Sequence, residues 1–268
     1  MPIPRGVMTV VEGCLFQLGF GLIRSGGRAL LSERKIGMVE TTSSRQPAAP
    51  DRLGLLCNEV LDANFLTAIL YMVKPELQVD VLFSAKDIEA WAPSITQKTR
   101  LIAFCSSVVV PAEILGKLAR PAYNFHPGPP EYPGKHPVAF ALYDGATTFG
   151  ATLHEMAFPV DSGPIAGVLQ FPVPPGSPYL WLMARTHQAA LHLFLQSVVA
   201  LARPSEPLNH LPISWGARRC GQKALDEACR LPFDITTDEL ERRRNSFGQV
   251  PGANLYVMLQ NRRFDLKP

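Results

Sequence analysis

The sequence predicts an α/β fold built on a mainly parallel sheet, with a smaller C-terminal appendage. Short apolar runs alternate with segments of helical periodicity after residue 55, which is typical of parallel strands joined by crossover helices. Hydrophobic residues make up 47% of the 268 residues, enough for a substantial core. The chain becomes more basic towards its end, so we expect a main domain at residues 1–203 and a small extension at residues 204–268.

The expected helices and strands follow from the spacing of apolar residues and from the prolines and glycines that end each element. Leu56–Val73 carries apolar residues at helical spacing, and Pro75 ends it. Val79–Phe83 is expected to be a central strand and Leu101–Cys105 the next strand. The other expected elements are a helical turn at Asp87–Trp91, helices at Pro111–Leu118, Val138–Tyr143 and Tyr179–Leu201, and strands at Gly150–Met156 and Ile165–Phe171.

The first 50 residues carry weaker signals. Thr9–Val11 and Ile36–Val39 are short apolar runs compatible with buried strands, and Leu15–Ile23 between them is compatible with a helix. Thr41–Pro50 has the composition of a loop or linker.

Composition excludes several classes of protein. The net charge of +3 does not indicate a nucleic-acid binder. The five cysteines are odd in number and lack C-x-x-C spacing, so we expect no disulfide framework and no metal site. Reduced thiols favour a cytoplasmic protein. Glu12 interrupts the most apolar N-terminal stretch, and no other stretch is long enough to span a bilayer, so we expect neither a signal peptide nor a membrane partner.

Three polar residues stand out as candidates for chemistry. Asn124 and His126 are two positions apart after a short strand-like segment, so their side chains point to the same side. Asp161 lies in a turn between two expected strands. An amide can donate to a developing oxyanion, an imidazole can move protons, and a carboxylate can orient that imidazole. Taken singly, each of these residues could equally form a helix cap or a hydrogen bond within a loop.

The segment Ala122–Gly134 resembles the signature loop of the folate-dependent formyltransferases, Asn-x-His-Pro-Ser-Leu-Leu-Pro-x-Tyr-x-Gly. Gly150–His154 and Val160–Ile165 then follow the family's Gly-x-Thr-x-His and Asp-(Thr/Gly)-Gly-x-Ile patterns in the same order. The match covers about residues 101–170. It implies a Rossmann-like formyltransferase fold, with N10-formyltetrahydrofolate as the formyl donor.

The resemblance also implies roles for individual residues. Asn124, His126 and Asp161 fall on the catalytic positions, and His154 is expected to support the site. Two departures stand out: Gly128-Pro129 replaces Ser-Leu-Leu beside His126, and the first 50 residues lack the family's opening strand. The residues expected to bind folate are Ser107, Val108, Val109, Val110, Met156 and Val160, and His136 is expected to contact the acceptor.

We therefore expect transfer of a formyl group to a primary amine, most simply that of a small molecule such as an amino sugar nucleotide. The amine would attack the formyl carbon directly, because no sequence motif indicates a cysteine or serine nucleophile. Three alternatives remain at this point: a methionyl-tRNA formyltransferase-like enzyme, which would bring tRNA as a partner, a formyltetrahydrofolate hydrolase, and a non-catalytic folate-binding relative. The sequence leaves the oligomeric state open, with a homodimer as one option.

Overall fold

The computed structural model describes residues 49–203 and 207–266, which lie within one compact unit. Six strands form the central sheet: β1 Arg52–Cys57, β2 Gln78–Leu82, β3 Thr99–Phe104, β4 Tyr123–His126, β5 Thr148–Glu155 and β6 Ile165–Pro172. The helices around it are α1 Val60–Val73, α2 Ala85–Trp91, η1 Ala92–Ser94, α3 Ala112–Lys117, α4 Pro137–Asp144 and α5 Tyr179–Ala202. The C-terminal elements are α6 Gln222–Cys229, α7 Thr237–Asn245, η2 Phe247–Gln249, β7 Tyr256–Leu259 and β8 Arg262–Asp265.

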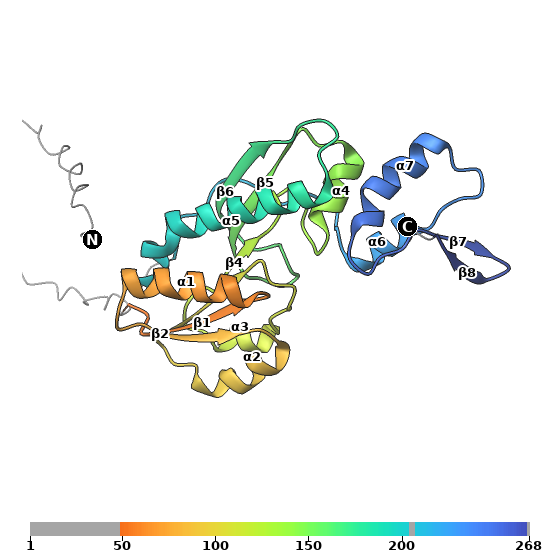
Figure 1. Cartoon of the computed structure of the whole chain (residues 1–268). Helices are drawn as coiled ribbons and strands as arrows, with labels where there is room; N and C mark the ends of the chain where they lie inside the picture. Colours follow the sequence, from red (N-terminus) through yellow and green to blue (C-terminus); the bar gives the residue numbers. More distant parts are fainter. Residues whose placement is uncertain (1–48, 204–206, 267–268) are drawn as a thin grey trace, which may run out of the picture. The chain divides into compact units, whose positions relative to one another are not determined.

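The sheet has the strand order β2-β1-β3-β4-β5-β6 (Figure 1). The first four strands pair in parallel, whereas β5 and β6 continue the sheet antiparallel. This confirms the predicted α/β class with a mainly parallel sheet. Asn124 and His126 lie on β4, at the junction of the parallel and antiparallel halves.

Side chains of the central strands point alternately to the two faces of the sheet, and each face packs against its own apolar layer. In β1, Leu53 and Leu55 face the layer shared with α1 and α5, whereas Leu56 faces the layer that holds α2 and α3. Helices therefore cover both faces of the sheet (Figure 1), the arrangement that crossover connections impose.

The predicted helix Leu56–Val73 was wrong at its start. Leu56 belongs to β1, and α1 begins only at Val60. The run from Leu53 to Cys57 is buried on both faces of the sheet, so it has no alternation to distinguish it from a helix. The family's opening strand was expected to be absent from the first 50 residues, and residues 1–48 lie outside the described part of the chain.

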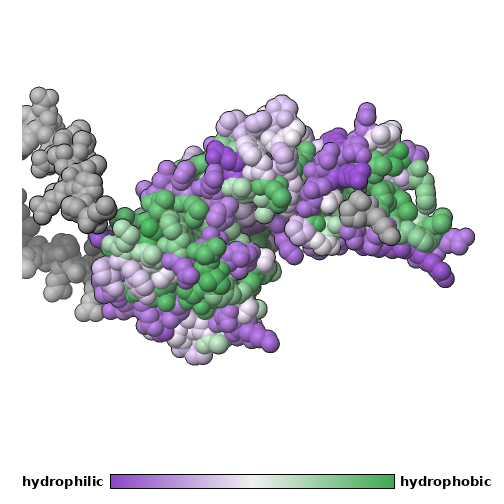
Figure 2. Space-filling view, in the orientation of Figure 1, coloured by the Kyte–Doolittle hydropathy of each residue, from purple (hydrophilic) through white to green (hydrophobic). Residues whose placement is uncertain are grey.

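The buried face of α1 also differs from the predicted one. Ala63, Leu66 and Leu70 face the core, while Leu61 is 82% exposed and Phe65 45% exposed. Figure 2 shows such apolar side chains gathered on the outer surface over α1. Several apolar residues counted toward the helical period therefore lie outside the core.

The strand expected at Val79–Phe83 forms as β2, but the prediction that it is central was wrong. It pairs only with β1 and ends the described sheet. Asp80 on this edge strand binds Arg52 Nε at 2.5 Å and accepts from Trp91 Nε1 at 3.0 Å. These polar contacts suit an edge strand that keeps one side accessible to water.

The described part of the C-terminal region packs against α4. Phe247 is buried against the rings of Phe140 and Tyr143, with ring centroids 5.1 and 4.8 Å apart. Glu239 of α7 accepts a hydrogen bond from Tyr143 and pairs with Arg243 one turn along its own helix. Part of the charge on α7 is thus paired within the helix itself. The division at residue 204, just after α5 ends, remains our proposal.

Other expectations concern the ends of the chain. The elements predicted between Thr9 and Val39 lie outside the described residues, as does most of the predicted linker. Among the residues that are described, no helix is long and apolar enough to cross a membrane.

Candidate active site

A cavity of about 470 Å³ opens where β4, the loop after β3 and the turn before β6 meet. All ten residues predicted from the sequence to form the site contribute to its lining. They are Asn124, His126 and Asp161, the folate candidates Ser107, Val108, Val109, Val110, Met156 and Val160, and the acceptor candidate His136. The structure thus brings ten residues that are spread between positions 107 and 161 of the sequence together around one cavity.

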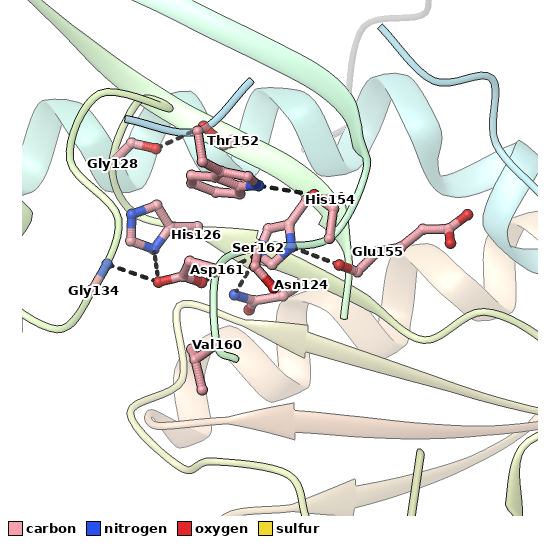
Figure 3. Close-up of polar contacts among 12 residues, drawn as sticks. Asn124, His126, Gly128, Gly134, Thr152, His154, Glu155, Val160, Asp161 and Ser162 are labelled. Carbon is pink, nitrogen blue, oxygen red and sulfur yellow. Dashed lines mark hydrogen bonds and ion pairs between the residues drawn. The ribbon is translucent and has the colours of Figure 1, made fainter. Parts of the chain in front are cut away.

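Asp161 lies between two imidazoles (Figure 3). Its Oδ2 atom is 3.6 Å from His126 Nδ1, and its Oδ1 atom is 3.3 Å from His154 Nε2. The Gly134 N–H donates to Oδ2 at 2.8 Å. All three ionisable side chains are at most 3% exposed, so their interactions are little screened by water.

The tautomers of the two histidines follow from their carbonyl partners, because a carbonyl oxygen can only accept. His154 Nδ1 donates to Glu155 O at 2.7 Å, so the neutral ring leaves Nε2 free to accept from Asn124 Nδ2 at 3.1 Å. His126 Nε2 donates to Tyr132 O at 3.1 Å. The neutral His126 ring therefore directs the lone pair of Nδ1 at the Asp161 carboxylate.

This arrangement explains the long 3.6 Å separation between His126 Nδ1 and Asp161 Oδ2. Two acceptors face each other, and neither supplies a proton. Asp161 Oδ1 likewise has no hydrogen-bond partner among the described residues, although it lies close to His154 Nε2. A proton gained by either ring would form a charge-assisted hydrogen bond to Asp161.

Burial and charge act in opposite directions on the pKa values here. Burial alone would raise the pKa of Asp161, but attraction to His126, the contact with His154 and the Gly134 N–H together lower it to about 2. Burial lowers the pKa of His126, and the attraction of Asp161 only partly offsets this. At neutral pH, the site thus holds a carboxylate beside a neutral imidazole that is able to accept a proton.

The pKa of Asp161 makes a prediction about stability. Its carboxyl binds a proton less tightly in the folded protein, so its stabilisation is complete above about pH 4 and is lost as the pH falls towards 2. We expect this group to remove about 2 kcal/mol from the free energy of unfolding over that range. Urea unfolding of wild type and Asp161→Asn between pH 7 and 2 measures it; equal slopes in the two proteins would contradict the assignment.

Several other residues line the cavity without having been predicted, and Asn58 is one of them. Asn58 Oδ1 accepts from the Ser107 N–H at 3.1 Å, and its Nδ2 donates to Cys105 O at 3.0 Å, where Cys105 has φ of +47°. Asn58 follows β1 directly, so recognition of that strand would have identified it as a residue at a carboxyl end. Lys135 and Gly221 also line the cavity.

His154 is closer to the chemistry than the sequence indicated. It was expected to support the site, and it contacts both Asn124 and Asp161 directly. The pairing of β4 with β5 places it there, because Asn124 lies opposite His154 in the register.

Gly128 accounts for the departure from the family loop. A Cβ at this position would lie 2.7 Å from His126 Nε2 and 2.8 Å from Pro137 Cβ. The Gly128 carbonyl accepts from Thr152 Oγ1 at 2.8 Å, which fixes the loop against β5. The absence of a side chain here leaves space for the His126 ring.

Comparison with known proteins agrees with this geometry. Residues 95–198 match the family model described as formyl transferase. A sugar N-formyltransferase from a Shewanella species is 17% identical over 81% of this chain and 96% of its own, with a TM-score of 0.63. An N-formyltransferase from Helicobacter canadensis, crystallised with folinic acid and dTDP-3-aminofucose, is 17% identical over 76% of this chain and 84% of its own, with a TM-score of 0.57.

HypX from Aquifex aeolicus, crystallised with tetrahydrofolic acid, shares the fold over part of its length. It is 18% identical over 79% of this chain but only 36% of its own, with a TM-score of 0.51. At such identities, the structural matches show a common fold, whereas the family model identifies the segment that carries the cavity. The family model thus identifies a formyl transferase segment at residues 95–198 of this chain.

Proposed function

We propose that the protein transfers a formyl group from N10-formyltetrahydrofolate to a primary amine of a small molecule, an amino sugar nucleotide being the best-supported class. The observation that carries this proposal is the convergence of Asn124, His126 and Asp161 on one cavity. The folate donor is supported by relatives crystallised with folinic acid or tetrahydrofolic acid. The acceptor class is supported by the relative crystallised with dTDP-3-aminofucose.

Apolar side chains on one side of the cavity suit a flat pteridine ring. Val109 and Val160 are 55% and 45% exposed although they line the cavity, and Val108 and Met156 lie beside them. Exposed apolar groups around a hollow favour a ligand that covers them. We therefore assign this wall to the folate and the side formed by His136 and Lys135 to the acceptor.

Asn124 is suited to stabilise the oxyanion. One N–H of its Nδ2 donates to His154 Nε2, which fixes the orientation of the amide. The second N–H remains available to the oxygen of the formyl group as the amine attacks and that oxygen gains charge. A donor fixed in advance needs no reorganisation during the reaction.

His126 and Asp161 are suited to take up the proton that the attacking amine releases. His126 stays neutral near pH 7 because burial lowers its pKa. A proton on Nδ1 would then be stabilised by Asp161 across the 3.6 Å gap. We propose that the pair acts as base to the amine and then as acid to the folate nitrogen that leaves.

The test of this function is turnover of N10-formyltetrahydrofolate with a panel of primary amines that includes amino sugar nucleotides. We expect tetrahydrofolate to form only when an amine is present. Formate released at the same rate without amine would favour a hydrolase instead. Binding of folinic acid with no turnover across the panel would favour a non-catalytic folate-binding protein.

Gly128→Ala is expected to lower kcat by roughly tenfold or more, because the new Cβ must displace the His126 ring. Gly128 does not line the cavity, so folinic acid affinity should change little. Gly116→Ala in α3 is the matched control, since its Cβ would meet nothing within 4 Å. Equal kcat values for the two variants would contradict the steric argument.

We also propose that the protein works in the cytoplasm. The four cysteines in the described part of the chain, Cys57, Cys105, Cys220 and Cys229, are all free thiols, as reducing compartments favour.

A further inference from the structure

A segment beyond the family match contacts residues that line the cavity and contributes Gly221 to the lining. Residues 213–222, which we call the strap, connect the region after α5 with α6. The Gly216 N–H donates to Pro130 O at 2.8 Å, and the Cys220 N–H donates to Pro133 O at 2.7 Å. Cys220 O in turn accepts from the His136 N–H at 2.9 Å. The strap is therefore bound by backbone hydrogen bonds to the loop that follows His126.

Two glycines allow this close approach. A Cβ on Gly134, which has φ of +117°, would lie 2.8 Å from the backbone of Cys220. A Cβ on Gly216 would lie 2.7 Å from Glu131 O. At each of these two glycines, the backbone of the other segment occupies the space that a side chain would need. The strap and the loop therefore pack closely against each other.

Trp215 of the strap contacts both histidines. Its ring packs edge-on against His154, with centroids 4.9 Å apart and planes at 86°, and against His126, at 5.7 Å and 72°. Its Nε1–H donates to Gly163 O at 2.8 Å, which fixes the indole to the turn that carries Asp161. One side chain thus touches the two imidazoles that flank the carboxylate.

Arg219 of the strap binds the backbone of Asp161, the carboxylate that lies between the two histidines. Its Nη1 donates to Asp161 O at 2.9 Å and to Val160 O at 3.2 Å. Asp161 has φ of +51°, a conformation that residues other than glycine adopt at a cost. These bonds from Arg219 help to hold the carboxylate between His126 and His154.

We propose that Trp215 is a positioning residue for the reaction, and that the strap makes the C-terminal region part of the active site. The inference deepens the proposed function and rests on it for its kinetic test. Trp215 touches no reacting atom; it sets the planes of the His126 and His154 rings and excludes water from their inner side. Histidine rings rotate readily about their terminal torsion, and a misplacement of about 1 Å can cost roughly 10²-fold in rate.

The kinetic test compares Trp215→Leu and Trp215→Phe in the full chain. For Trp215→Leu we expect kcat to fall by about 10–100-fold, with KM for N10-formyltetrahydrofolate within about threefold of wild type, because the indole does not line the cavity. Trp215→Phe keeps an aromatic edge and should recover a large part of kcat. The acidic limb of the pH profile should also shift in Trp215→Leu, because water reaches the two rings.

Trp181→Leu is the matched control. Trp181 lies on α5, is 36% exposed and contacts Phe171 rather than the site. We expect its kcat and pH profile to match wild type. A Trp215→Leu protein that is folded by circular dichroism, with wild-type kcat and pH profile, would overturn the proposal.

A second readout does not depend on turnover. In ¹⁵N–¹H spectra of the imidazole groups, loss of the indole ring should shift the His126 and His154 signals in Trp215→Phe and Trp215→Leu, and Trp181→Leu should leave them in place. Trp215→Phe alone decides the matter where Trp215→Leu does not fold. Phenylalanine has a smaller ring and lacks the N–H that binds Gly163 O, so imidazole signals that stay unchanged even in Trp215→Phe refute the positioning role. If wild type turns over none of the amines but the signals shift as expected, the proposed function fails and the placement of the rings by Trp215 stands.

Discussion

Replacing Asn124 with alanine is expected to reduce kcat by about 10²–10³-fold while the protein stays folded. Asn124 is the side chain whose free N–H can meet the developing oxyanion, and loss of one such donor typically has this effect. Its amide nitrogen also supplies the hydrogen bond that His154 Nε2 accepts at 3.1 Å, so His154 loses a partner as well. Steady-state turnover of N10-formyltetrahydrofolate with the best acceptor measures the change.

The interpretation depends on separating catalysis from binding. Folinic acid affinity of Asn124→Ala should stay within a few-fold of wild type, because the proposed pteridine wall is formed by other residues such as Val109 and Val160. Asn245→Ala, at the exposed end of α7, is the control and should retain full activity. Near-normal turnover in Asn124→Ala would remove the oxyanion role from this residue.

The sequence predicted the sheet because its strands are short apolar runs between helix-like segments. It failed at β1 for a definite reason. Leu53–Cys57 is buried on both faces, and only Asn58 and Glu59 separate it from α1, so the sequence alone gives little to mark where the strand ends and the helix begins. β2 was predicted to within one residue at each end but in the wrong position in the sheet, since strand order is set by pairing and not by hydrophobicity.

The sequence predicted only those parts of the site that depend on the spacing of neighbouring residues. Asn124 and His126 share a face because they are two apart on one strand, which a sequence shows directly. Asp161 stood out as a polar turn residue, but only the family resemblance placed it beside Asn124 and His126, because a turn residue carries no sign of the strand it will approach. Trp215 and Arg219 belong to a segment without regular secondary structure, and they contact residues more than 50 positions away. No periodicity marks such contacts, so only the folded chain reveals them.

Asp161→Asn is expected to lower kcat by at least about 10²-fold. The change keeps the shape of the side chain and an oxygen for the Gly134 N–H, but it removes the negative charge between the two imidazoles. At 3.6 Å, the attraction between a carboxylate and an imidazolium is on the order of 4 kcal/mol at an effective dielectric constant of about 20. Relaxation of the site would reduce this attraction. A hundredfold fall in kcat requires the loss of about 2.7 kcal/mol of transition-state stabilisation.

The pH profile distinguishes this electrostatic role from a general loss of structure. Asp161 raises the pKa of His126 against the lowering effect of burial, so its removal should lower that pKa further. The acidic limb of kcat should therefore move to lower pH in Asp161→Asn, while the maximal rate falls. Asp80→Asn removes a carboxylate that binds Arg52 on the edge strand, and it should change neither quantity. A limb that stays in place in Asp161→Asn, or that moves to higher pH, would show that His126 does not take up its proton beside Asp161.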